Sequence, residues 1–325
     1  MSTLVSIVRL GRFVPLPRVR VQDLGRQVGI PLLAILVFLV LWSRVSAGVQ
    51  TTLGQIPGPV AVWQQAGVLW ADHVAERARA SAFYDRQARR NAAILAANPS
   101  APVATMAYTG KPTYVDQIVT SLETVFAGFL LASVLAVPLG IACGLSRTLN
   151  AGINPFIQIL RPVSPLAWLP IVTMVVSAVY VSQEPIFAKS FITSAITVAL
   201  CSLWPTLINT AHGVSSIDKD LMNVAKVLRL NWTTKLVKVV VPASLPLIFT
   251  GLRLSLGVGW MVLIAAEMLA QNPGLGKFVW DEFQNGSSDS LARIMVAVFT
   301  IGIIGFLLDR VMLAVHRVVD FGSQR

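Results

Sequence analysis

Four ionisable residues interrupt long apolar stretches of this sequence: Glu123, Arg253, Glu267 and Asp309. A charge in an apolar environment is costly, so such residues are candidates for binding a polar ligand. Arg253 and Glu267 lie deepest in their stretch, and their separation of fourteen positions is about 21 Å along a helix. They cannot pair with each other. Both are predicted for a substrate pathway, although for Arg253 a structural contact within its own helix bundle is the favoured alternative.

Two tryptophans, Trp168 and Trp260, lie in similar apolar stretches. Their large rings are predicted to line the same pathway. Packing within a bundle or against lipid is the more common use of such side chains, and it is the alternative for both.

Residues 211–243 form a second candidate site, because they hold five basic residues between two apolar stretches. Ser215 and Asp218 fit a capping box and predict a helix start. The negative charge of Asp220 would stabilise this start by its interaction with the positive end of the helix dipole. The helix should be amphipathic and end near Leu230. Its apolar face is predicted to comprise Leu221, Val224, Ala225 and Leu228.

A second short helix is predicted from Asn231 to Val241. Pro242 and Pro246 follow and should force the chain to turn before the next apolar stretch, since proline cannot continue a helix hydrogen-bond ladder. Two short helices at an angle would form a compact surface in which the small side chain of Ala225 permits close contact.

Catalytic motifs are missing from the sequence. Neither Gly-Lys pair has the preceding glycine or the following Ser/Thr that a phosphate-binding P-loop needs. The three histidines are far apart, and no C-x-x-C, H-x-x-x-H or G-x-S-x-G spacing occurs. We predict a non-catalytic chain with no metal or cofactor of its own.

Composition predicts the elements that carry these residues. Of 325 residues, 55% are hydrophobic and only 13% charged, which indicates an all-α integral membrane protein. Stretches of about 20 apolar residues are long enough to cross a bilayer as helices. Six spans are predicted, at residues 28–48, 118–144, 163–181, 191–210, 244–269 and 294–315.

Lysine and arginine in the connecting segments predict the orientation, because cytoplasmic loops tend to retain them. Residues 1–28 form a cytoplasmic segment, 29–48 the first transmembrane helix, 49–117 an extracytoplasmic segment, 118–315 the core and 316–325 a cytoplasmic tail. The net charge of +11 is spread over many loops, which favours contact with membrane lipid over nucleic acid. Within residues 49–117, regularly spaced charges predict one or two helices, which form either a structural cap or a docking surface for an extracytoplasmic partner.

Several stretches, taken in order, resemble a known family. Residues 223–246, "NVAKVLRLNWTTKLVKVVVPASLP", resemble the E-A-A loop of permease subunits of binding-protein-dependent ABC importers, in the branch for nitrate, bicarbonate, taurine and alkanesulfonates. "RPVSPLAWLPI", "WPTLINTAHGV" and "IGIIGFLLDR" extend the resemblance over nearly all of residues 115–310. The variant "NVAKVLRL" is similar to the nitrate/nitrite or bicarbonate type.

The resemblance implies a type I importer permease with a MetI-like bundle in the bacterial cytoplasmic membrane. It implies a small anion as substrate, with nitrate or nitrite first and bicarbonate, cyanate or a sulfonate as alternatives. The implied partners are a second permease copy, two cytoplasmic ATPase subunits that hold the ATP and Mg, and a solute-binding protein. An ATP-independent transporter and a membrane scaffold are the alternatives from other classes.

The same resemblance implies that residues 211–243 are the loop that couples the permease to its ATPase. The residues implied in this contact are Asp218, Asp220, Asn223, Ala225, Leu228, Arg229 and Pro242. Two of them depart from the family pattern, which has glutamate at the position of Asn223 and glycine at that of Arg229.

Overall fold

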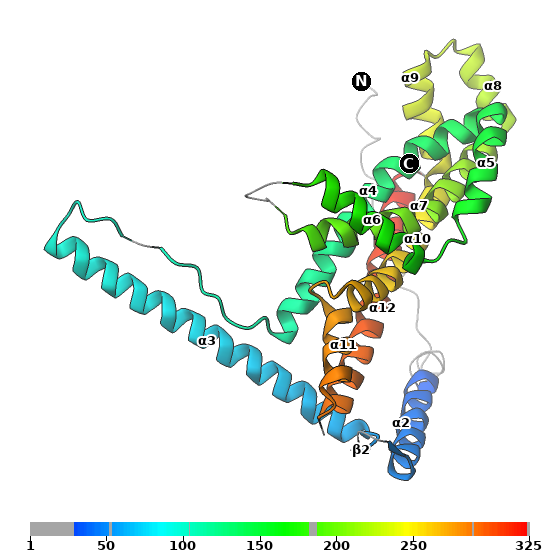
Figure 1. The fold of residues 1–325 in the computed structure, drawn as a ribbon. Coiled ribbons are helices and arrows are strands. Elements are labelled where there is room, and N and C mark those ends of the chain that lie inside the picture. Colours follow the sequence, from blue (N-terminus) through cyan, green and yellow to red (C-terminus); the bar gives the residue numbers. More distant parts are fainter. Residues whose placement is uncertain (1–28, 52–53, 104, 182–186, 288, 324–325) are drawn as a thin grey trace, which may run out of the picture. The chain divides into compact units, whose positions relative to one another are not determined.

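The computed structural model describes residues 29–51, 54–103, 105–181, 187–287 and 289–323, and these are mostly helical (Figure 1). The predicted cytoplasmic segment 1–28 lies outside the described residues. The chain divides into two compact units, Met1–Val60 and Ala61–Arg325. The all-α class predicted from composition is confirmed.

The described part of the first unit contains helix α2, Ile30–Gly48, and a small antiparallel hairpin of β1, Gln50–Thr51, and β2, Gly54–Gln55. Ser46 is the buried residue of α2, whose apolar side chains otherwise face outward, as suits a helix surrounded by lipid. Helix α2 coincides with the first predicted span. The hairpin was not predicted.

Four long helices form the centre of the second unit: α4, Tyr114–Leu145; α7, Lys189–Ser215; α10, Val241–Ala270; and α12, Ser290–Ser323. Helix α7 packs against both α4 and α10. Their interface buries a core that includes Val125, Val198 and Leu263.

Glycines let α4 approach α7 closely. A Cβ atom placed on Gly128 would lie 2.6 Å from the Ala195 carbonyl oxygen, and one on Gly140 would lie 2.7 Å from Thr210 Cβ. Small residues play this role in membrane bundles, where water provides no hydrophobic drive between helices.

The predicted span at residues 163–181 is not a complete membrane helix. Helix α6, Pro165–Val179, has 15 residues, about 22 Å of rise, and the preceding helix α5, Arg147–Leu160, meets it at 102°. Ser164 caps α6 by accepting a hydrogen bond from the Leu166 N–H at 3.3 Å, so the chain starts a new helix there. Of the described residues, five helices are long and apolar enough to span a membrane, or six if α5 and α6 count as one broken span.

Three further described regions outside the central helices are also helical. Residues predicted to form one or two helices outside the membrane form a single helix of 39 residues, α3, Pro59–Ala97. Helix α11, Leu275–Asn285, lies between the last two predicted spans, and it packs against α10 and α12. The predicted coupling loop contains α8, Lys219–Val227, and α9, Trp232–Lys235, followed by the π-helical turn η2, Leu236–Val240.

Candidate functional site

The loop between α7 and α10 begins with a cap that differs from the predicted one. Asp218 caps α8 by accepting a hydrogen bond from the Asp220 N–H at 2.9 Å. Ser215 instead belongs to α7, where its hydroxyl donates to the His212 carbonyl at 3.0 Å. The predicted Ser215 capping box is therefore wrong, because α7 continues through that serine and leaves Asp218 at the first free position.

Helix α8 ends in a Schellman motif built around Arg229. The Leu230 N–H donates to the Ala225 carbonyl at 3.1 Å, and the Arg229 N–H donates to the Lys226 carbonyl at 3.0 Å. This pattern needs a left-handed residue just beyond the helix, and Arg229 has a φ of 51°. Glycine adopts that conformation without steric cost, so the position where the family pattern has glycine is a position where the backbone requires φ > 0.

The second short helix starts where it was predicted, and the turn after it does not form. Asn231 caps α9 by accepting from the Thr234 N–H at 2.9 Å. The chain then stays helical through η2 into α10, with Pro242 in the first turn of α10. The predicted turn at Pro242 and Pro246 is wrong. In η2 the Val241 N–H bonds to the Leu236 carbonyl five residues back, and proline in a first helical turn needs no N–H partner.

The predicted apolar face of α8 divides into an exposed and a buried part. Ala225 is only 2% exposed and packs inside the chain. The exposed apolar side chains of α8, its C-cap and the start of α9, which we call the loop surface, are Leu221, Val224, Val227, Leu228 and Trp232. Asn223 and Arg229 are exposed beside them. The structure thus offers a partner an apolar surface beside Arg229. This surface lies on two short capped helices, α8 and α9, whose position Figure 1 shows.

Arg253 is paired within the bundle. Its Nη2 donates to Asp309 Oδ2 at 3.0 Å, and its Nε donates to Asp309 Oδ1, so the pair joins α10 to α12. Sequence reasoning singled out both residues without pairing them, because they are 56 positions apart. The pair lines an open groove of about 730 Å³ together with Thr250, Met261 and His316. The Arg253 side chain is 42% exposed, so its guanidinium can still donate toward the groove.

Glu267 is fully surrounded by protein at 1% exposure. Its carboxylate accepts from Ser121 Oγ of α4 at 2.8 and 2.9 Å and from the Gly276 N–H of α11 at 2.9 Å. Ser121 Oγ in turn accepts from the Leu275 N–H at 2.9 Å. These groups, which we call the Glu267 node, satisfy free N–H groups in the first turn of α11 and join three helices.

Backbone geometry explains the glycines of the node. Gly274 has a φ of 147°, and a Cβ on it would lie 2.2 Å from the Glu267 carboxyl carbon. A Cβ on Gly276 would lie 2.2 Å from the Ile264 carbonyl oxygen. The structural contacts of Glu267 are clear, whereas a contact with substrate remains a prediction.

The two predicted tryptophans differ in environment. Trp260 is 5% exposed in the core, and its Nε1–H donates to the Ile301 carbonyl of α12 at 3.0 Å. Trp168 is half-buried on α6, and its Nε1–H is buried without a hydrogen-bond partner among the described residues. Trp168 therefore keeps a free donor, while Trp260 has the packing role that was the alternative for both.

No group of three or more potential metal ligands occurs among the described residues. Arg253 and the Glu267 node join helices of the bundle, and the geometry offers hydrogen-bond donors and a surface for a partner.

A family model described as "Binding-protein-dependent transport system inner membrane component" matches residues 136–322. The chain is 32% identical over 286 residues to the nitrate import permease protein NrtB of Synechococcus elongatus, covering 87% of each chain. It is 36% identical over 282 residues to the bicarbonate transport system permease protein CmpB of the same species, covering 86% of this chain and 85% of that one.

Among solved structures, an inward-facing MetNI methionine ABC transporter chain superimposes with a TM-score of 0.53. The match covers 63% of this chain and 95% of that chain at 14% sequence identity, so it concerns the fold alone.

Proposed function

The chain belongs to the family of binding-protein-dependent transport system inner membrane components, and from that premise we propose that it admits nitrate or nitrite through an ATP-driven importer. It is a multi-pass permease of the nitrate and bicarbonate branch of ABC importers. The proposed substrate rests on the similarity to a nitrate import permease, and the loop variant "NVAKVLRL" supports the nitrate and bicarbonate branch as a whole.

Bicarbonate is the second candidate, because a relative named for bicarbonate transport is 36% identical over nearly the same share of the chain. Nitrate and bicarbonate are both small planar oxyanions that need N–H or O–H donors along their path. In this proposal Arg253 supplies donors at the groove between α10 and α12. These donors suit both anions, so they do not separate the two candidates.

The loop surface carries the proposal for energy coupling. Apolar side chains exposed on two short capped helices gain free energy when a partner covers them. We propose that a cytoplasmic ATPase subunit binds there, and that a second copy of this chain carries an equivalent contact. ATP and Mg would be held by the ATPase subunits, and a solute-binding protein would deliver the anion from the other side.

Reconstitution tests the proposal. The chain, purified with its ATPase subunits in lipid vesicles, should hydrolyse ATP faster when its binding protein is loaded with nitrate or nitrite. Stimulation by bicarbonate alone would make bicarbonate the substrate. No stimulation by any of the three anions would contradict import of this anion class.

A substitution on the loop surface tests the coupling contact. Leu228→Asp places a charge on a side chain that is 63% exposed, so it should leave insertion intact and reduce anion-stimulated ATP hydrolysis at least about tenfold. Leu149→Asp, at an exposed leucine of α5, is the matched control. Normal stimulation in the Leu228 variant would contradict this placement of the ATPase.

A further inference from the structure

Three arginines in the second half of α3 form a cluster of positive charge. Arg86, Arg89 and Arg90 are all exposed, and none takes part in the ion pairs that the described residues form. Nearer the middle of the helix, Arg77 and Arg79 have carboxylate partners. We call these three arginines the arginine end of α3. Their positive charges are therefore available to an external partner.

A pocket lies within the arginine end. Its volume is about 200 Å³, and it is lined by Phe83, Arg86, Gln87, Arg90 and Met106. Gln87 Oε1 accepts from the Met106 N–H at 3.0 Å, which leaves the amide NH₂ of Gln87 free to donate. Two guanidinium groups one helical turn apart and one amide thus present hydrogen-bond donors, with an aromatic ring and a thioether beside them.

The chain that returns from α3 supports this pocket. The Tyr108 hydroxyl donates to Glu76 Oε1 at 2.7 Å, and the Tyr108 N–H donates to the Tyr84 hydroxyl at 3.2 Å. The rings of Phe83 and Tyr108 lie 5.5 Å apart. These contacts hold the returning segment against α3, so the pocket has two fixed walls.

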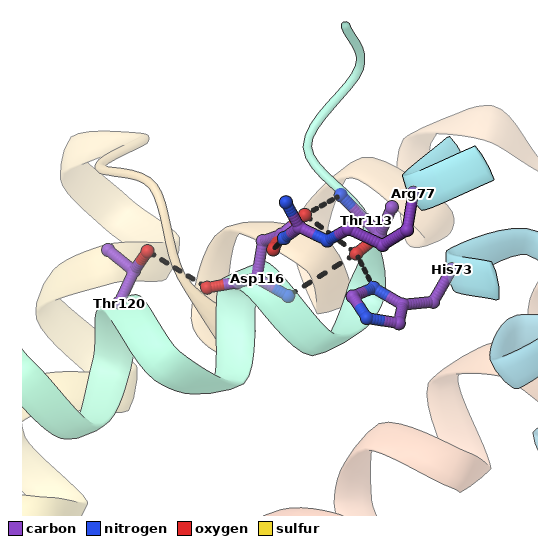
Figure 2. Close-up of polar contacts among 5 residues, drawn as sticks. All are labelled: His73, Arg77, Thr113, Asp116 and Thr120. Atoms are coloured by element: carbon purple, nitrogen blue, oxygen red, sulfur yellow. Dashed lines mark hydrogen bonds and ion pairs between the residues drawn. The ribbon is translucent and has the colours of Figure 1, made fainter. Parts of the chain in front are cut away.

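Nearer its middle, α3 is attached to the start of α4 (Figure 2). We call α3 and the segment that returns from it the arm. Thr113 Oγ1 donates to Asp116 Oδ2 at 2.7 Å, so its single hydrogen is used. His73 Nδ1 lies 2.7 Å from Thr113 Oγ1 and must therefore donate to that hydroxyl oxygen. Arg77, one turn further along α3, pairs with Asp116 Oδ1. Two side chains of α3 thus bind the capping box of α4, about 20 to 25 Å along the helix from Arg90.

We propose that the arginine end of α3 is the docking surface for carboxylates of the solute-binding protein. This inference rests on the proposed function and on the predicted extracytoplasmic placement of residues 49–117. Arginine, tyrosine, phenylalanine and methionine together are typical of protein interfaces, where buried arginines contribute strongly to binding. Exposed arginines hold a single small anion weakly, whereas a folded protein presents several carboxylates at once.

The contacts of His73 and Arg77 connect the docking surface to the membrane bundle. A protein bound at the arginine end contacts an arm that is hydrogen-bonded to the first turn of α4, the helix that packs against α7. Docking and the membrane bundle are therefore connected through two side chains.

The test uses the complete transporter in nanodiscs and its purified solute-binding protein. Arg86→Glu with Arg90→Glu should raise the Kd for the binding protein at least about tenfold and remove most of its salt dependence. The basal ATPase rate should stay unchanged. Arg147→Glu with Arg161→Glu, an equal change of charge at exposed positions of the α5 region, is the matched control.

The milder pair Arg86→Gln with Arg90→Gln guards against misfolding and should show an intermediate Kd. A Kd within about twofold of the wild-type value in both pairs would overturn the docking surface. So would an effect that appears only when the nanodisc contains anionic lipid, because the arginines would then bind headgroups. Binding by the wild type without stimulation by any anion would contradict the proposed substrate and would leave the docking surface supported.

Discussion

Removal of the Glu267 carboxylate should release the start of α11 from the bundle. Glu267→Ala leaves two buried donors, the Gly276 N–H and the Ser121 hydroxyl, without their acceptor. Each buried unsatisfied donor costs about 1–3 kcal/mol, so the loss in the free energy of unfolding should be about 4 kcal/mol once the small cavity is included.

Glu267→Gln separates the acceptor from the charge. Its side-chain carbonyl can still accept from Gly276, while its NH₂ group replaces Oε1, the nearer acceptor of the Ser121 hydroxyl. One hydrogen bond is lost, and the desolvation cost of a buried charge is also lost, so the net destabilisation should be only about 1–2 kcal/mol. The predicted order of stability is wild type, then glutamine, then alanine.

Two measurements check the Glu267 prediction. Unfolding of the purified chain by SDS titration from mild detergent micelles gives the global change, and hydrogen exchange at the first amides of α11 gives the local one. Asp281→Asn is the matched control, because that carboxylate pairs with Lys277 on the surface of the same helix and should contribute at most about 1 kcal/mol. A Glu267→Ala variant as stable as the Asp281 control, with unchanged exchange in α11, would refute the reasoning.

Three further predictions concern other contacts. Arg229→Gly should stabilise the α8–α9 loop by about 1 kcal/mol and slow hydrogen exchange in α8, because glycine accepts the left-handed φ, whereas Arg229→Ala should not. The hydrogen bond from Tyr108 lowers the pKa of Glu76 from its ordinary value of 4.5. The ionised Glu76 carboxylate therefore stabilises the folded chain above pH 4.5, and this stabilisation is lost as the pH falls through the lowered pKa. Hydrogen exchange in the returning segment should therefore quicken on acidification, and Tyr108→Phe should weaken that response; an unchanged pH response would contradict the assignment. For the Arg253–Asp309 pair, Arg253→Gln combined with Asp309→Asn should destabilise less than the sum of the single changes, by about 1 kcal/mol in thermal unfolding, and strict additivity would show that the pair contributes nothing.

Local signals in the sequence predicted local structure well where one residue decides it. Asn231 begins α9 because its side chain can bond an amide three residues on, whatever surrounds it. The long spans follow from the hydropathy of about 20 consecutive residues, which is also a local property of the sequence. Glycines at positions 128 and 140 permit close helix approach, as the Cβ distances show.

The wrong predictions depended on the neighbourhood of a residue. Pro242 reads as a helix breaker, yet the π-helical turn before it allows the helix to continue. Helix α11 was missed because its start is stabilised by the Glu267 node, whose partners are up to 154 positions apart in the sequence. The periodicity of α8 identified its apolar residues, but only tertiary packing decides that Ala225 is buried while Leu228 is exposed. Family glycine at the position of Arg229 was the one available signal for the left-handed turn.

The arrangement of contacts along α10 has a consequence for coupling. Helical structure runs without interruption from Trp232 to Ala270, 39 residues or about 58 Å, so the loop surface and the Glu267 node are attached to one continuous element. Between these ends, Arg253 and Trp260 bond to α12, and Ser255 bonds to α7. If an ATPase moves the loop, the side-chain bonds to α7 and α12 must either travel with α10 or exchange. The pair at Arg253 borders an open groove and is partly exposed, so its rearrangement would leave no fully buried polar group unpaired.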